Sequence, residues 1–134
     1  MRTPQFKKYS KVKKLKSKGL EYRNTNLEFG FFGLKALSNG RLNLKNIETA
    51  RQSISRHIRP FGKLWIRIFD YVPISSSPAK VRMGKGKGSF SYWGSKVKKG
   101  QIIFEVSGIT REQALLALRI GGSKLPMKTK VVKY

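Results

Sequence analysis

The stretch from Arg82 to Gly88, RMGKGKG, has the composition in this 134-residue sequence that most suggests ligand chemistry. Alternating glycines with lysines between them resemble the loops that hold the phosphates of bound nucleotides. A P-loop needs G-x-x-x-x-G-K-[ST] and a dinucleotide fold needs G-x-G-x-x-G, and neither spacing occurs in this stretch. Both patterns also require a helix directly after the glycines, whereas the strand-like SFSYW follows here. The spacing therefore argues against a mononucleotide site.

The side chains that could catalyse a reaction are few and scattered. The acidic residues are Glu21, Glu28, Glu48, Asp70, Glu105 and Glu112. No two of them share the spacing of a catalytic dyad or a metal site, and cysteine is absent, which excludes thiol chemistry and cysteine zinc sites. The single histidine, His57, is interpreted as a helix C-terminal cap or an RNA contact. We predict a protein that is not an enzyme and holds no metal and no cofactor.

The charge of the chain points to a polyanionic partner. Thirty Lys and Arg against six Asp and Glu leave a net charge of +24. In an isolated compact domain these positively charged side chains would repel one another and destabilise the fold. Nucleic acid and an anionic membrane could both neutralise it. There is no apolar run of about 18 residues, and the basic residues are spread along the chain instead of gathered on one amphipathic helix. The pattern favours nucleic acid and no membrane partner.

The first residues differ in composition from the rest of the chain. Residues 1–24 are predicted to be a basic N-terminal arm, and residues 25–134 a single domain. A segment with so much charge cannot bury enough apolar surface to offset the entropy that it loses on ordering. We therefore expect the arm to be disordered alone and to become ordered when it binds phosphates. A tail that only aids solubility is the alternative. The lysines proposed to bind are Lys7, Lys8, Lys11, Lys13, Lys14 and Lys16.

Residues 27–62 predict a strand and then a helix. LEFGFFGLKAL reads as a strand with a bend or bulge at its glycines, ended by a turn at residues 38–41. A helix follows from an N-cap at Asn43 to the breakers Pro60 and Gly62. Its apolar face is Ile47, Ala50, Ile54 and Ile58. Its other faces carry Arg51, Arg56 and Arg59.

The remaining residues predict more strands and a second helix. KLWIRIF is a strand, DYVPISSSP a loop and AKVRM a short strand, while SFSYWGSKV and QIIFEVSG are strands joined by a hairpin at KKG. A helix begins at Thr110, with a capping box to Gln113, and ends at Gly121-Gly122 before the strand TKVVKY. This order predicts an α+β fold: a single two-layer domain with a mostly antiparallel sheet and two helices on one face.

Two features remain ambiguous from composition alone. The glycine-lysine loop could be a finger pressed against nucleic acid or a solvated hairpin tip. Five aromatic residues could form a stacking surface for single-stranded RNA, which is the alternative function, or could lie in the core, which we favour. They are Trp65, Phe69, Phe90, Tyr92 and Trp93.

Six ordered segments resemble one protein family. GKLWIRIF, RMGKGKGSFSYW, GQIIFEVSGI and SKLPMKT occur in the order found in the L-sixteen family of large-subunit ribosomal proteins. FGFFGLKAL and RLNLKNIETARQSISR resemble the first strand and first helix of that family. The resemblance covers the chain from about residue 27 onward, and the basic arm matches the family in type more than in residues.

The resemblance implies a structural constituent of the large ribosomal subunit. Its implied partners are large-subunit rRNA, tRNA in the aminoacyl site and neighbouring large-subunit ribosomal proteins. It also implies that the glycine-lysine loop and the arm reach toward the tRNA cleft near the peptidyl transferase centre, where RNA performs the chemistry. The residues assigned to rRNA or tRNA binding are the six arm lysines, Arg51, Arg56, Arg59, Arg82, Gly84, Lys85, Gly86, Lys87 and Gly88.

The balance of basic residues bears on the compartment. Lysine outnumbers arginine twenty to ten, and KNIETARQSIS is rich in residues with A/T-rich codons. This composition favours an organelle-encoded protein of the mitochondrial ribosome. The cytoplasm of a low-GC bacterium and a plastid are the alternatives.

Overall fold

The chain folds into two antiparallel sheets and two helices. The computed structural model describes residues 4, 9, 11–13 and 16–134. The elements in chain order are β1 (Phe32–Ala36), β2 (Gly40–Asn43), α1 (Leu44–Ile58), β3 (Lys63–Ile66), β4 (Val72–Ser76), β5 (Ser89–Val97), β6 (Ile102–Ser107), α2 (Arg111–Ser123) and β7 (Thr129–Lys133). The strand orders are β3-β6-β1-β7 and β2-β5-β4. The predicted α+β class and antiparallel pairing are confirmed, although the strands form two sheets instead of one.

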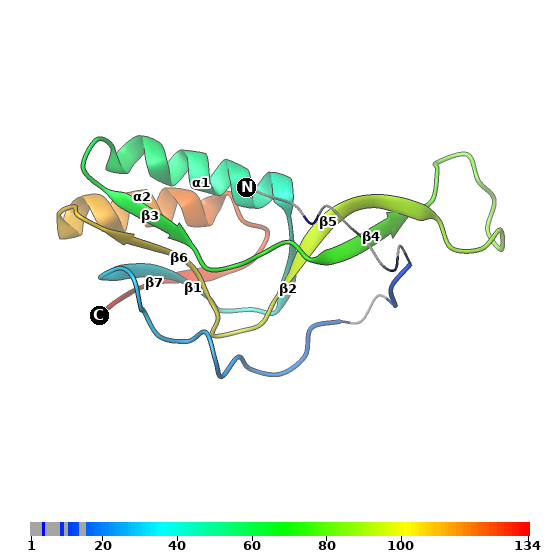
Figure 1. Cartoon of the computed structure of the whole chain (residues 1–134), viewed down its shortest axis with the longest axis horizontal. Coiled ribbons are helices and arrows are strands. Elements are labelled where there is room, and N and C mark those ends of the chain that lie inside the picture. The colour runs from blue at the N-terminus through cyan, green and yellow to red at the C-terminus, as the bar shows by residue number, and fades with distance from the viewer. Residues whose placement is uncertain (1–3, 5–8, 10, 14–15) are drawn as a thin grey trace.

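Both helices cover the same face of the four-stranded sheet, as predicted (Figure 1). Helix α1 begins at Asn43, whose side-chain oxygen accepts a hydrogen bond of 3.3 Å from the Lys45 amide. The predicted apolar face is confirmed, because all four of its residues are buried. They pack against Leu34, Phe104 and Leu118 in the core. Among the described residues, no helix has the length and apolar character needed to cross a membrane.

Helix α2 differs from the prediction at both ends. Thr110 is its N-cap, but the threonine side chain makes no capping hydrogen bond, so the predicted capping box is wrong. Gly121 and Gly122 lie inside the helix, which runs to Ser123, instead of ending it. A Cβ on Gly121 would lie 2.4 Å from Cγ1 of Ile54. The glycine therefore serves the close packing of α2 on α1, a requirement that is not visible in the local sequence.

The strand predictions were wrong around β1 and β2. Residues 27–31 precede β1 instead of belonging to it, although the register of β1 against β6 does shift between Leu34 and Lys35, as a bulge would require. The predicted turn at residues 38–41 contains the start of β2, which pairs with β5.

The hairpin was also assigned to the wrong strands. The predicted loop DYVPISSSP contains β4, and the predicted strand AKVRM is instead part of a long turn. Strands β5 and β6 belong to different sheets, so KKG does not join a hairpin; β5 pairs with β4 across the glycine-lysine loop. Pro73 is tolerated in β4 because this strand lies at the edge of its sheet.

A segment without regular structure crosses the face of the four-stranded sheet opposite the helices (Figure 1). The Glu21 amide donates to the Lys99 carbonyl and the Ile102 amide donates to the Asn24 carbonyl, each at 2.9 Å. With helices on one side and this segment on the other, residues 102–106 of β6 are all buried. The boundary between arm and domain at residue 24 stays a prediction.

Replacing Ile54 with alanine is expected to lower the free energy of unfolding by about 2–5 kcal/mol, because the side chain is fully buried between α1 and α2. Arg56→Ala, at an exposed position of the same helix, should change it by less than about 0.5 kcal/mol. Urea unfolding followed by circular dichroism measures both. Equal losses would contradict the burial of Ile54 between the two helices.

Candidate nucleic-acid interface

The glycine-lysine loop lies at one end of the molecule. Strands β4 and β5 form a hairpin that extends away from the helices, and the loop is its tip (Figure 1). Residues 77–87 are all exposed, and the Met83 side chain is completely so. Arg82, Lys85 and Lys87 are therefore carried on a thin projection at a distance from the core.

The three glycines of the loop have different roles. Gly84 and Gly86 have φ angles of +82° and +81°, a region that other residues rarely adopt, and no atom lies within 4 Å of a Cβ placed on either. A Cβ on Gly88 would lie 2.2 Å from the Ser76 carbonyl oxygen. The first two shape the loop, and the third lets the two strands of the hairpin close.

A hydrogen bond joins the glycine-lysine loop to the arm. Lys87 Nζ donates a hydrogen bond to the Val12 carbonyl, so this lysine holds the arm against the hairpin. Lys11, Lys13 and Lys16 are exposed. Lys7, Lys8 and Lys14 lie outside the described residues.

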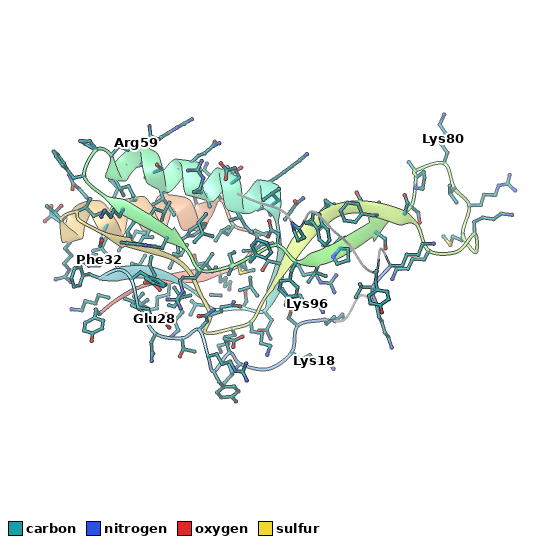
Figure 2. All side chains as sticks on the ribbon, viewed as in Figure 1. Lys18, Glu28, Phe32, Arg59, Lys80 and Lys96 are labelled. Atoms are coloured by element: carbon teal, nitrogen blue, oxygen red, sulfur yellow. The ribbon has the colours of Figure 1, made fainter. Side chains whose placement is uncertain are left out.

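The helix arginines lie far from the loop. Figure 2 shows Arg59 and Lys80 at opposite ends of the molecule. Arg51 is held by Glu48 of the same helix, with its Nη2 2.6 Å from Glu48 Oε1, and this contact lowers the pKa of that glutamate. Arg56 and Arg59 are exposed. Those predicted residues that the structure describes thus occupy three regions along the molecule and do not form one compact site.

His57 occupies the predicted position in the last turn of α1. Its Nδ1 lies 2.8 Å from the Ser53 carbonyl oxygen one turn earlier. This contact is local to the helix, as a structural role requires. No group of three or more potential metal ligands occurs among the residues that the structure describes.

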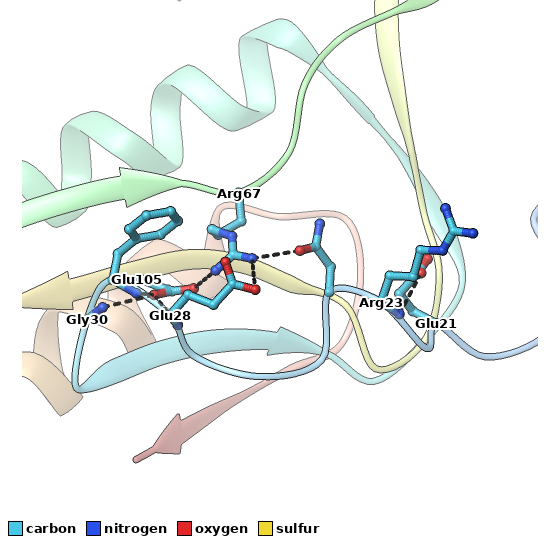
Figure 3. Close-up of polar contacts among 8 residues, drawn as sticks. Glu21, Arg23, Glu28, Gly30, Arg67 and Glu105 are labelled. Atoms are coloured by element: carbon cyan, nitrogen blue, oxygen red, sulfur yellow. Dashed lines mark hydrogen bonds and ion pairs between the residues drawn. The ribbon is translucent and has the colours of Figure 1, made fainter.

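A buried carboxylate fixes the segment that leads into β1 (Figure 3). Glu105 Oε2 accepts backbone hydrogen bonds from Glu28, Phe29 and Gly30 at 3.2, 2.8 and 2.9 Å. Its other oxygen accepts from Arg67 Nη1 at 2.5 Å. Arg67 Nη2 lies 2.7 Å from Asn24 Oδ1 and 3.1 Å from Glu28 Oε1. One ion pair therefore connects β6, the β3–β4 connection and the segment before β1.

Burial alone would raise the pKa of Glu105. Hydrogen bonds from the Phe29, Gly30 and Glu28 amides and from Arg67 outweigh that cost and hold the pKa of this carboxyl below its usual value. Asp70 behaves in the opposite way. It is buried, neither of its oxygens has a hydrogen-bond partner among the described residues, and burial raises its pKa.

The prediction that five aromatic residues lie in the core is wrong. None belongs to the buried core, and Phe69 and Tyr92 are 49% and 39% exposed. The Trp65 ring stacks on Phe29 at 6.2 Å, over the sheet face that carries Glu105. The Phe90 and Trp93 rings meet at 5.1 Å on β5. They do not form one open platform either, because Trp65 is covered by Phe29.

Sequence reasoning missed a basic groove formed by segments distant in the chain. Lys16 and Lys18 line one side, Phe69 and Tyr71 come from the β3–β4 connection, and Lys96 with other residues comes from the end of β5. These residues are neighbours only after folding, so no local spacing pattern could have revealed the groove.

The family is decided by comparison with known proteins. The family model described as ribosomal protein L16p/L10e matches residues 4–132. The chain belongs to this family. It is 47% identical over 133 residues to the large ribosomal subunit protein uL16 of Sinorhizobium medicae, covering 99% of this chain and 97% of the relative. The uL16 proteins of Gluconobacter oxydans and Francisella tularensis subsp. holarctica are 47% and 44% identical, with the same 99% of this chain covered and 96% and 97% of the relatives.

Membership in the L16p/L10e family confirms the resemblance seen in the sequence. The chain is a ribosomal protein, and the expectation that it is not an enzyme agrees with a family of structural ribosomal proteins. The relatives named above are all bacterial, which fits the bacterial alternative and gives the mitochondrial prediction no support.

Replacing Glu105 with glutamine should lower the free energy of unfolding by about 3–5 kcal/mol, because Arg67, whose side chain is 8% exposed, loses its fully buried partner. Glu28→Gln removes the partner that is 55% exposed and should cost less than about 1 kcal/mol. Chemical denaturation of both variants measures the difference. A small effect at Glu105 would show that the ion pair does not anchor the segment.

Glu105 should also make stability depend on pH. A carboxyl whose pKa is lower in the folded than in the unfolded protein contributes stability above the unfolded value, 4.5, and loses it as pH falls through the folded value. The unfolding temperature of the wild type should therefore fall below about pH 4.5. In Glu105→Gln the unfolding temperature should fall less steeply over the same pH range. An unchanged slope in the variant would contradict the assignment.

Proposed function

We propose that this chain is a structural constituent of the large ribosomal subunit that binds large-subunit rRNA beside the aminoacyl-tRNA site and helps to position tRNA. Family membership and the name of its relatives, large ribosomal subunit protein, support the assignment to this subunit. The remaining partners are neighbouring large-subunit proteins. The resemblance of the loop and arm to the family supports the approach to the tRNA cleft.

The observation that carries the proposal is the exposed basic loop on a projecting hairpin. A net charge of +24 needs phosphates to neutralise it, and the loop presents Arg82 and Lys85 at exposed positions, with Gly84 and Gly86 on either side of the lysine. Arginine can fork onto a phosphate or stack on a base, while lysine acts as a mobile point charge. Phosphate contacts fix orientation without reading sequence, so the loop would act as a positioning device.

The arm and the helix arginines would supply further phosphate contacts. Lys11, Lys13 and Lys16 are exposed beside the hairpin, and Arg56 and Arg59 are exposed at the other end. A protein with cations in several separate regions suits a partner that surrounds it, as folded rRNA would. The same distribution would be of little use for a small anionic ligand.

The loop is tested with Arg82→Ala combined with Lys85→Ala, which removes two exposed charges and leaves the Lys87 contact with Val12 intact. Ribosomes carrying this pair should assemble, because the core does not involve the loop, but should accommodate aminoacyl-tRNA about 10-fold more slowly if two phosphate contacts are lost. Rapid kinetics with labelled tRNA measures the rate.

Lys124→Ala with Lys133→Ala is the matched control, since it removes two exposed charges outside the loop. It should leave the accommodation rate unchanged. Gly86→Val should slow accommodation further, because valine resists the positive φ of this residue. If both loop variants accommodated aminoacyl-tRNA at the wild-type rate, the positioning role would be wrong and the loop would be only a solvated hairpin tip.

A further inference from the structure

A basic groove of about 600 Å³ lies where three segments meet. Residues 16–24 form one wall, the β3–β4 connection a second, and the end of β5 with the following turn a third. Lysines 16, 18, 96 and 98 line it, whereas Glu21 is the one acidic residue among its described lining residues. Figure 2 shows Lys18 and Lys96, which come from two of these walls. The Arg67 guanidinium in the groove is already paired with Glu105, so the lysines supply its unpaired positive charge.

Two aromatic rings accompany these charges. Phe69 and Tyr71 are 49% and 59% exposed, whereas Ile68 and Asp70 beside them are 5% and 1% exposed. Buried and exposed side chains thus alternate along residues 68–71, with Ile68 and Asp70 directed inward and the two rings directed outward. Exposed rings next to lysines are the combination that binds nucleic acid bases and their phosphates.

The walls of the groove are held by hydrogen bonds. The Glu21 amide donates to the Lys99 carbonyl at 2.9 Å, and Leu20 forms a parallel bridge with Lys99. Arg67 Nη2 donates to Asn24 Oδ1 at 2.7 Å, which ties the first wall to the second. A ligand would thus meet a groove formed in advance, and binding would cost little ordering of the protein.

We propose that this groove binds a single-stranded segment of RNA. One unpaired base stacks on the exposed ring of Tyr71, and the flanking phosphates lie against Lys18, Lys96 and Lys98. A duplex fits this chemistry poorly, because its bases are already stacked and cannot present a face to the ring. The inference rests on the proposed function, and it adds residues and an RNA conformation that the loop and arm do not specify.

The test measures binding of the full chain to a fluorescein-labelled single-stranded oligoribonucleotide of about ten nucleotides and to an RNA duplex of the same length. Tyr71→Ala should weaken binding of the single strand about 10-fold, within the range for loss of one stacked base, and binding of the duplex less than about twofold. Tyr71→Phe keeps the ring and should restore binding. Tyr134→Ala, at a side chain that is 90% exposed outside the groove, should have no effect.

The charges are tested with matched pairs. Lys96→Ala with Lys98→Ala should weaken binding of the single strand about 10-fold, whereas Lys124→Ala with Lys133→Ala removes the same charge outside the groove and should weaken it less than about threefold. Circular dichroism and thermal melting confirm that each variant folds. Equal losses from the two lysine pairs, or no difference between Tyr71→Ala and Tyr134→Ala, would overturn the proposal.

Two further outcomes separate the hypotheses. Competition by a polyglutamate peptide as strong as that by the oligoribonucleotide would assign the groove to an acidic protein segment and overturn the RNA proposal. If the wild-type chain bound large-subunit rRNA tightly and no groove variant changed that binding, the groove proposal would be wrong and the proposed function would stand. Failure of the wild-type chain to bind rRNA would overturn the proposed function together with it.

Discussion

The buried carboxylate of Glu105 fixes the segment before β1 to the four-stranded sheet and to the β3–β4 connection. Residues 28–30 lie outside any helix or strand, so their amides need partners from elsewhere in the protein. Glu105 provides one oxygen to all three, and its second oxygen neutralises Arg67, whose other nitrogen reaches Asn24. Breaking this network would leave an uncompensated buried charge and would free the segment that crosses the sheet. The wall of the basic groove depends on the path of that segment.

The position of the hairpin depends on a second constraint, the length of β5. Gly94 lies near the middle of this strand and faces Val72 of β4 on one side and Asn43 of β2 on the other. Asn43 is also the N-cap of α1, so the same short stretch links the hairpin to the helices. A loop on such a hairpin keeps a defined direction relative to the core. Its exposed glycines and basic residues can then meet a partner at a fixed place.

The distribution of charge explains why the fold tolerates a net charge of +24. The interior between the helices and the four-stranded sheet is apolar, and the lysines that the structure describes all lie outside this core. Repulsion among them still disfavours the compact state. A polyanion that binds the folded chain would relieve that repulsion and shift the equilibrium toward the folded form. Stability in isolation and stability on RNA are therefore different quantities for this protein.

The sequence by itself determined the charge, the lack of catalytic spacing among the acidic residues and the apolar face of α1, because each depends on residue type or on spacing within one segment. It also determined the family, because six recognisable segments occur in a fixed order along the chain. Neighbouring residues alone did not distinguish β4 from a loop, because the strand forms only by pairing with β5. They also did not show that Gly121 packs against α1 instead of ending its own helix, because its contact is with Ile54, which is distant in the chain. The same reason applies to the burial of Glu105 and to the basic groove. Glu105 reads as an ordinary strand charge until residues 28–30 and Arg67 are brought to it. The groove likewise exists only because folding brings three basic or aromatic segments, which are distant from one another in the chain, to one place.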